Sequence, residues 1–471
     1  MRDSAPSAPV GRKGSRNSTS AYASYVFFVM FSINLLNYMD RYIFTGAANT
    51  IAKELNFGID GIGVIASAFL VIYTLGSLPL GFWADRAKRK DVIAISVALW
   101  SIATTFTALV GNFTTLFISR MLLGIGEAGY YPAGTALLSD YFNRARRARI
   151  MSWWTVGAFI GLLIGFVFGG VFAGLAVGSW RLAFLFAGLP GLVLAFLAWR
   201  LHEPRRSQAD DEAQELTPSS STNTFEAAET NLRISPPNVV SRFGILLRIK
   251  TLVVLIVMQL FAFFVLGVNT VFLPTYLQQK DTFGLSPGIA GIFSGGVIVI
   301  AGVIGVIIGG YLSDVLNRRY PGARVLVCGI GFLLGAPAFV LAITTHTFAL
   351  FGIFTAITVL LVNFYNGPCA AATQDVVPSS LRASAIALSL LLAHLFGDTL
   401  APTLLGMLAT SFDPTHGQHF LHGMAGQDLG EALLLMCSPA LVIAGLAGIL
   451  GSRWMKNDIA AAMHADTLRN R

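Results

Sequence analysis

The sequence predicts an all-α membrane protein with twelve transmembrane helices in two pseudo-symmetric six-helix halves. Three observations predict this fold: the composition, the number of long apolar runs and an internal repeat. Of the 471 residues, 55% are hydrophobic and only 12% are charged, whereas an average globular chain carries about 25% charged residues. So few charges cannot cover the surface of a soluble protein of this length. The composition therefore argues against a soluble enzyme and against a nucleic-acid-binding protein.

Twelve apolar runs are long enough to cross a bilayer, because a helix needs about 20 apolar residues to span the hydrocarbon core. These runs cover residues 22–45, 60–83, 91–110, 113–139, 148–174, 179–200, 250–277, 287–312, 323–343, 347–371, 382–411 and 431–453. The only long polar stretch between them is rich in Ser, Thr and acidic residues, and it predicts a flexible linker. The expected domains are a cytoplasmic N-tail 1–20, an N-terminal half 21–200, a cytoplasmic linker 201–249, a C-terminal half 250–454 and a cytoplasmic C-tail 455–471.

The basic residues predict the orientation of the bundle, because cytoplasmic segments carry an excess of Lys and Arg. With the N-terminus inside, 27 of the 32 basic residues fall in cytoplasmic segments. The opposite side keeps Lys53, Arg181 and Lys280, and Arg41 and Arg120 lie within apolar runs. We therefore expect both termini in the cytoplasm. The Ala-rich composition favours a bacterial inner (plasma) membrane.

The two halves repeat a pattern of Gly, Asp and Arg at their predicted cytoplasmic ends. After the second run the pattern is Gly81, Asp85 and Arg89, and after the eighth run it is Gly310, Asp314 and Arg318. After the fourth run Asp140 and Arg147 parallel Asp375 and Arg382 after the tenth run. Gly allows helices to cross closely, and Asp and Arg can form ion pairs or interact with helix ends. These residues predict a cytoplasmic gate, with positive-inside anchoring as the alternative interpretation.

Polar residues within the apolar runs are few, and ionisable ones cost about 2.5–3.5 kcal/mol on insertion scales. The first run carries Asn34, Asn37, Asp40 and Arg41, and the fourth carries Arg120, Glu127 and Tyr131. From the rise of about 1.5 Å per residue, Asp40, Arg41 and Arg120 share one layer. Arg41 or Arg120 could then reach Glu127. Glu127 or Asp40 would carry a proton and an Arg would bind an anionic headgroup, or the charges would form static ion pairs.

The C-terminal half has fewer ionisable residues in its apolar runs. His394 and Asp398 are four residues apart in the eleventh run and share one helix face. They predict either a satisfied interior histidine or a second site for substrate or protons. A cavity that is polar on one side and apolar on the other suits an amphipathic substrate better than a sugar.

The parallel repeat and its gate motif resemble the major facilitator transporters. Three further segments resemble the Spinster family: Asn37 to Tyr42, Arg120 to Ala128, and His394 to Asp398 followed by Pro402. The resemblance implies a secondary active transporter that works by alternating access and is coupled to protons. It also implies a lipid-like cargo of the lysophospholipid or sphingoid phosphate class. By the same resemblance, binding and proton coupling are expected at Asp40, Arg41, Arg120 and Glu127.

An alternative is a proton-coupled transporter of small organic anions, in which Arg41 or Arg120 binds a carboxylate. A membrane enzyme is disfavoured because the sequence has no Ser/His/Asp grouping and no metal-ligand spacing, and the matched gate motifs disfavour a channel. The three cysteines, Cys328, Cys369 and Cys437, lie in or beside apolar runs and predict buried apolar side chains. We expect no cofactor, no metal site and no nucleic-acid partner. The expected partners are substrate, protons and the lipid bilayer, and the chain is expected to be a monomer.

Overall fold

The computed structural model describes residues 13–205, 239–415 and 418–469, and it has no strand in these ranges. The N-terminal half contains α1 (Lys13–Glu54), α2 (Ile59–Arg86), α3 (Arg89–Thr107), α4 (Phe113–Tyr141), α5 (Arg144–Leu175) and α6 (Trp180–Trp199). The C-terminal half contains α9 (Val239–Leu246), α10 (Lys250–Gln278), α11 (Pro287–Asn317), α12 (Ala323–Thr344), α13 (Phe348–Val362), η1 (Asn363–Tyr365), α14 (Asn366–Val376), η2 (Ser379–Leu381), α15 (Arg382–Ala393), η3 (His394–Asp398), α16 (Ala401–Phe412), α17 (Gln418–His422), α18 (Gly426–Gly451) and α19 (Met455–Arg469). Most of the predicted N-tail and most of the acidic linker lie outside the described residues.

All twelve predicted runs are helical. Among the residues that the structure describes, eleven helical spans are long and apolar enough to cross a membrane. The remaining predicted run is α4, whose Arg120 and Glu127 lower its mean hydropathy. α4 packs against α2 and α3 within the N-terminal half, as a spanning helix of the bundle would. The predicted all-α fold of twelve spans in two halves is confirmed.

Two spans of the C-terminal half are interrupted rather than continuous. The run at 347–371 is α13 and α14 joined by the 3-10 turn η1, and the run at 382–411 is α15 and α16 joined by the π-helical turn η3. Apolar periodicity does not reveal such breaks, because the side chains on both sides remain apolar. A π-turn within an α-helical span is uncommon and often marks a functional position.

The predicted C-tail is an ordered part of the C-terminal half. Residues 455–469 form α19, which packs against α14. Asp458 accepts a hydrogen bond from the backbone N–H of Thr251 at 2.8 Å, and Asp466 accepts one from Ser379 at 3.0 Å. A carboxylate is favourable near a helix N-terminus, so α19 caps the ends of α10 and η2. The helix α1 also begins earlier than predicted, at Lys13.

Close packing of α1 against α5 orients the polar residues of the N-terminal half. Gly161 and Gly165 of α5 face the backbone carbonyls of Leu35 and Met39 on α1. A Cβ atom at Gly165 would lie 2.6 Å from the Met39 oxygen, which is closer than van der Waals contact allows. Small residues permit this approach in a membrane bundle, and it fixes the rotation of α1 about its own axis.

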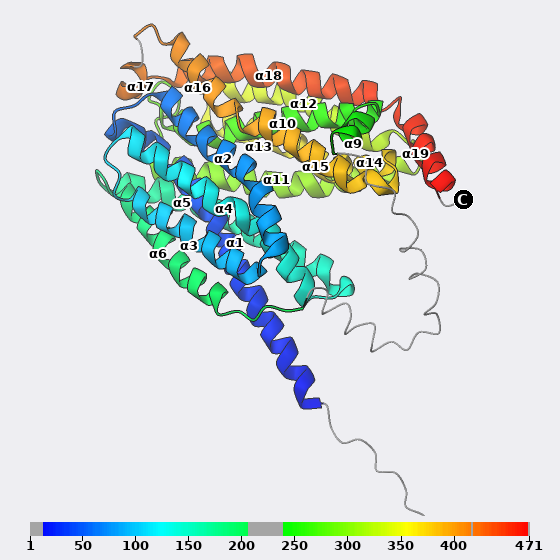
Figure 1. Cartoon of the computed structure of the whole chain (residues 1–471). Coiled ribbons are helices and arrows are strands. Elements are labelled where there is room, and N and C mark those ends of the chain that lie inside the picture. The colour runs from blue at the N-terminus through cyan, green and yellow to red at the C-terminus, as the bar shows by residue number, and fades with distance from the viewer. Residues whose placement is uncertain (1–12, 206–238, 416–417, 470–471) are drawn as a thin grey trace, which may run out of the picture.

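The two halves meet at one end of the bundle, which we call the outer end. There α2 packs against α16 and α5 packs against α11. A Cβ atom at Gly63 would collide with the Pro402 carbonyl, and one at Gly291 would collide with the Phe166 carbonyl. Toward the end that carries the termini, the halves diverge in Figure 1, and a Cβ atom at Gly310 would meet no atom within 4 Å. The halves are thus in contact at the outer end and diverge toward the opposite end, which we call the open end.

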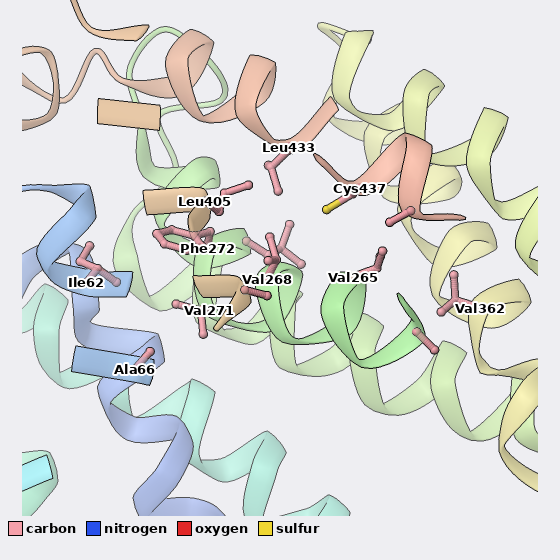
Figure 2. Close-up of a cluster of buried hydrophobic side chains, with 14 of the residues drawn as sticks. Ile62, Ala66, Val265, Val268, Val271, Phe272, Val362, Leu405, Leu433 and Cys437 are labelled. Atoms are coloured by element: carbon pink, nitrogen blue, oxygen red, sulfur yellow. The ribbon is translucent and has the colours of Figure 1, made fainter. Parts of the chain in front are cut away.

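A buried apolar cluster continues across the contact between the halves. Its members in Figure 2 include Ile62, Ala66, Val268, Val271, Phe272, Leu405 and Leu433. Ile62 and Ala66 come from α2 of the N-terminal half, and the others come from the C-terminal half. The contact at the outer end therefore consists of buried apolar side chains as well as closely packed glycines.

A larger side chain at Gly291 is expected to open the outer end. Gly291→Val would force α11 away from the Phe166 carbonyl of α5, because two backbones this close leave no room for a Cβ atom. Spin labels at Val177 and His346, in outer loops of the two halves, should show longer distances by double electron–electron resonance. Gly296→Val is the matched control on the same helix, since no atom lies within 4 Å of its Cβ position. Equal distances in Gly291→Val and the unsubstituted protein would contradict the expectation.

Candidate functional site

Two adjacent charges on α1 point in different directions and divide the polar residues of the N-terminal half into two groups. Asp40 and Arg41 are consecutive, so their side chains leave the helix about 100° apart. Arg41 faces Glu127 on α4 and aromatic side chains on α2, whereas Asp40 faces Thr104 on α3. The close α1–α5 contact determines which way each side chain points.

Arg41 and Glu127 form a buried ion pair between α1 and α4. The Nε of Arg41 donates to Oε2 of Glu127 at 2.5 Å, and the Glu127 side chain has no exposed surface. The Arg41 side chain is 16% exposed. Glu127 Oε1 has no hydrogen-bond partner among the described residues. This pairing is one of the two predicted for Glu127.

Aromatic rings surround the Arg41 guanidinium. Its carbon lies 4.4 Å from the ring centre of Tyr73, 5.2 Å from that of Tyr38 and 5.3 Å from that of Phe69. Cation–π contacts of this kind hold a guanidinium in place without using its hydrogen-bond donors. The bond to Glu127 uses one of five N–H donors, so Arg41 keeps donors with which to bind an anionic ligand.

The other charged group lies inside the N-terminal half. Asp40 Oδ2 accepts from the Thr104 hydroxyl at 3.2 Å, and Arg120 Nη2 donates to the Thr107 hydroxyl at 3.1 Å. The guanidinium carbon of Arg120 lies 4.9 Å from the Phe184 ring centre. Both charged side chains are buried. Asp40 Oδ1 and Arg120 Nε have no hydrogen-bond partner among the described residues. Arg120 therefore contacts α3 and α6 instead of Glu127.

The three neutral polar residues predicted here occupy different positions. Asn34 donates to the Trp154 carbonyl at 2.7 Å and so links α1 to α5. Asn37 is buried, and its side-chain amide lies beside the Glu127 carboxylate. Tyr131 is 49% exposed, and its ring stacks on Trp154 at 5.1 Å. Tyr131 is thus the accessible member of the three.

His394 and Asp398 face each other within the π-helical turn η3. Nδ1 of His394 lies 3.0 Å from Oδ2 of Asp398, and their side chains are 35% and 15% exposed. The imidazole ring lies 4.6 Å from the ring of Phe263 on α10. The turn η3 also contacts α2 of the opposite half. The predicted pair is therefore formed at a helix irregularity beside the contact between the halves.

An apolar pocket lies within the C-terminal half between α10, α12 and α13. It is lined by Val265, Leu266, Asn269, Leu273, Phe339, Ala342, Ile343, Phe351, Thr355, Thr358, Val359 and Val362. Its few polar groups are the side chains of Asn269, Thr355 and Thr358. The Asn269 amide already donates to the Val265 carbonyl at 2.7 Å. The Arg41–Glu127 pair and the apolar pocket thus belong to different halves.

The predicted gate residues of the N-terminal half form an ion pair at the open end. Arg89, the first residue of α3, pairs with Asp140 and donates to the Ala136 carbonyl at 3.2 Å. Arg147 donates to the Ser139 carbonyl at 2.8 Å. Gly81 and Asp85 lie in the last two turns of α2. These contacts connect the ends of α3, α4 and α5 within one half.

In the C-terminal half the corresponding ion pair uses an arginine that the sequence comparison did not select. Arg324 on α12 pairs with Asp375 on α14, and its Nη2 lies 3.4 Å from Asp314 Oδ1. Arg324 follows Arg89 by 235 residues, as Asp375 follows Asp140. The match of Arg318 to Arg89 is therefore corrected, since Arg324 holds the equivalent position. Among the described residues neither Arg318 nor Arg382 forms an ion pair. The loop before α12 is longer than the loop before α3, so Arg318 lies before α12 whereas Arg89 lies at the start of α3.

Charge reversal at Arg324 tests this correction. Arg324→Glu would place a third carboxylate beside Asp314 and Asp375, and like charges at this distance repel. A partly exposed pair contributes up to about 1 kcal/mol, so we expect a melting temperature about 1–2 °C lower in detergent for a chain of this length. Adding Asp375→Arg should restore most of this loss. Arg318→Glu is the control, and an equal loss in that variant would contradict the assignment.

Polar contacts at the outer end were not predicted from the sequence. Asn49 of α1 donates to Oε1 of Gln278 at 3.0 Å, and Gln279 donates to Oδ1 of Asn49 at 3.3 Å. Ser67 of α2 accepts from the backbone N–H of Thr403 on α16 at 3.2 Å. These bonds connect the two halves. In the sequence, the two consecutive Gln residues at the end of an apolar run could have indicated a polar contact at this end of the bundle.

Comparison with known proteins agrees with this architecture. The family model of the Major Facilitator Superfamily matches residues 30–402. Protein spinster homolog 1 of Xenopus laevis is 28% identical over 434 residues, which cover 88% of this chain and 77% of that protein. Protein spinster homolog 3 of Danio rerio is 27% identical over 450 residues, which cover 91% of this chain and 85% of that protein.

Solved structures of transporters have the same fold. A bacterial homologue of the human lysosomal transporter Spinster, in an inward-facing and unoccupied conformation, superimposes with a TM-score of 0.79 at 24% identity, covering 93% of this chain and 98% of that one. A D-xylose–proton symporter superimposes with a TM-score of 0.63 at 17% identity, covering 88% and 96%. The chain is thus an integral multi-pass transporter that belongs to the Major Facilitator Superfamily and is similar to its Spinster proteins.

Proposed function

We propose that this transporter moves a lipid-like amphiphile, of the lysophospholipid or sphingoid phosphate class, by proton-coupled alternating access. The observation that carries the proposal is the buried Arg41–Glu127 ion pair at 2.5 Å. When the Glu127 carboxylate takes up a proton, it loses its charge and no longer holds Arg41. Protonation is in this way coupled to release of the arginine. The freed guanidinium, held by Tyr73 and its neighbours, would then bind a phosphate headgroup with two parallel hydrogen bonds.

The mostly apolar side chains between α10, α12 and α13 favour an amphipathic cargo. A sugar needs many paired donors and acceptors, which this lining does not offer. A phosphate-bearing lipid needs one cationic group and an apolar surface for its chain. Small organic anions are the second candidate, because the Arg41 guanidinium would bind a carboxylate equally well. Such anions would not use the apolar pocket.

In this proposal Asp40, Arg120, His394 and Asp398 are further candidates for proton coupling. Asp40 and Arg120 are buried and incompletely hydrogen-bonded. A change in the charge of either residue would therefore alter the contacts between helices of the N-terminal half. His394 and Asp398 lie at the π-turn beside α2, where a proton could influence how the halves meet. Asn34, Asn37 and Tyr131 would line the path around these groups.

In the proposed mechanism, residues 21–200 and residues 250–454 move relative to each other as two bodies, which the linker 201–249 joins. With the basic residues on the cytoplasmic side, the termini and the open end of this conformation face the cytoplasm. The ion pairs Arg89–Asp140 and Arg324–Asp375 hold helix ends together within each half. We propose that these ends, with Gly81, Asp85, Arg147, Gly310, Asp314, Arg318 and Arg382, form the cytoplasmic gate in the opposite conformation. The protein would act as a monomer in a bacterial inner membrane.

Transport into proteoliposomes tests the proposed substrate class. A fluorescent lysophospholipid is offered with and without an imposed pH gradient, in competition with unlabelled sphingosine phosphate or with short organic acids. We expect gradient-dependent uptake that the phosphate-bearing lipid suppresses and the short acids do not. Suppression by short acids alone would favour the organic-anion candidate, and uptake that ignores the gradient would contradict proton coupling.

A further inference from the structure

Three side chains with metal-binding atoms converge at the outer end of the C-terminal half. Asp413 follows α16, His419 lies in α17 and Asp428 lies in the first turn of α18. One ligand atom from each lies within 4.8 Å of the other two. The residues are six and nine positions apart in sequence, so no short motif reveals them.

The distances between these atoms are close to those around a tetrahedral zinc ion. His419 Nδ1 lies 3.0 Å from Asp428 Oδ2 and 3.4 Å from Asp413 Oδ1. Metal–ligand bonds of about 2.0–2.2 Å at tetrahedral angles place neighbouring ligand atoms about 3.4 Å apart. Each carboxylate therefore already lies at nearly the distance from the imidazole that one ion would impose.

Hydrogen bonds from the surrounding backbone orient the Asp413 carboxylate. Asp413 Oδ1 accepts from the backbone N–H of Thr415 at 2.7 Å, and Asp413 Oδ2 accepts from that of His419 at 3.2 Å. Such outer bonds hold metal ligands in place. The side chains of Asp413 and Asp428 are only 4% and 10% exposed, whereas that of His419 is 35% exposed. The imidazole is thus the most exposed of the three side chains.

We propose that Asp413, His419 and Asp428 bind a divalent transition-metal ion of the zinc type at the outer end. An imidazole nitrogen favours zinc over calcium or magnesium, which prefer oxygen ligands. Two nearly buried carboxylates neutralise the charge of the ion. This proposal differs from the expectation of no metal made from the sequence, and it does not depend on the proposed substrate or on proton coupling.

The ion would stabilise a segment that covers the contact between the halves. The backbone N–H of Ala425 donates to Oε1 of Gln279 at 3.4 Å, and Gln279 donates in turn to Asn49 of α1. The Lys53 ammonium of α1 lies 5.6 Å from the ring centre of Phe420. A ligand that orders this segment favours the conformation in which these contacts exist. Bound metal should therefore favour closure of the outer end.

The alternative occupant of the site is a proton. The hydrogen bond to Asp428 raises the pKa of His419, and a protonated imidazole between two carboxylates needs no metal.

A direct measurement of metal binding distinguishes a bound metal ion from a bound proton. Protein purified without a polyhistidine tag and stripped with chelator is titrated with Zn²⁺ against a chromophoric competitor. Its melting temperature is recorded with and without Zn²⁺.

We expect one Zn²⁺ per chain and a higher melting temperature when it is bound. Loss of an outer-sphere partner alone costs about 10–100-fold in affinity, so His419→Ala and Asp428→Asn should each lose at least about 100-fold. Asp428→Asn preserves the shape of the site and serves if His419→Ala does not fold. His422→Ala is the matched control, because the one hydrogen bond of its exposed imidazole within the described part of the chain is to the Gln418 carbonyl, at 2.8 Å. No stoichiometric binding, an equal loss in His422→Ala, or equal binding of Ca²⁺ would overturn the proposal.

Discussion

Glu127→Gln is expected to abolish transport driven by a pH gradient while leaving cargo binding measurable. Gln is nearly isosteric with Glu and can accept a bond from Arg41, but it cannot gain or lose a proton. The Arg41–Glu127 ion pair would therefore no longer depend on pH. Gradient-driven uptake should fall to the level of empty liposomes, and exchange of internal for external lysolipid should persist.

The matched control for Glu127→Gln is Glu431→Gln. Glu431 is an exposed carboxylate on α18 that accepts a bond from Gln427 at 3.1 Å. Its replacement should leave both gradient-driven uptake and exchange unchanged. Full gradient-driven uptake by Glu127→Gln would refute the coupling role of this residue. Loss of exchange and binding together would assign Glu127 a folding role instead.

Arg41→Ala is expected to weaken binding of phosphate-bearing cargo far more than binding of uncharged cargo. A hydrogen bond to a charged group contributes about 1.5–3 kcal/mol, which corresponds to about 10–100-fold in affinity. An uncharged lysolipid analogue makes no such bond to Arg41. Its affinity should therefore change only as far as the aromatic rings around Arg41 repack. Scintillation proximity binding with both ligands measures the difference.

Two comparisons separate recognition by Arg41 from a general loss of stability. Arg41→Lys retains the charge without the planar guanidinium, so it should bind phosphate cargo with intermediate affinity. Arg120→Ala removes an arginine that contacts Thr107 and Phe184 inside the half, so it should lower the melting temperature more than it changes ligand preference. Equal losses for charged and uncharged cargo in Arg41→Ala would contradict recognition of the headgroup.

The sequence predicted the spans well because lipid imposes a simple rule of length and apolarity. It also predicted that an arginine could reach Glu127, since depth along a helix follows from residue number. It did not distinguish Arg41 from Arg120, because that choice depends on the rotation of each helix about its axis. The rotation of α1 follows from its close contact with glycines of α5.

Contacts between distant segments were the hardest to predict. Arg324 was missed as the partner of Asp375 because the comparison relied on spacing within one loop. The hydrogen bonds between Asn49 and the side chains of Gln278 and Gln279 join α1 to α10. Neither segment has a sequence pattern that identifies the other as its partner. The interruption at η3 was also missed, since its residues suit a regular helix.

Proton movement caused by cargo tests the central claim most directly. Proteoliposomes that contain a pH-sensitive dye receive a lysophospholipid in the absence of any imposed gradient. The proposed coupling predicts a change of internal pH that depends on the lipid and disappears in Glu127→Gln. Transfer of the lipid without any change of internal pH in the unsubstituted protein would contradict proton-coupled transport.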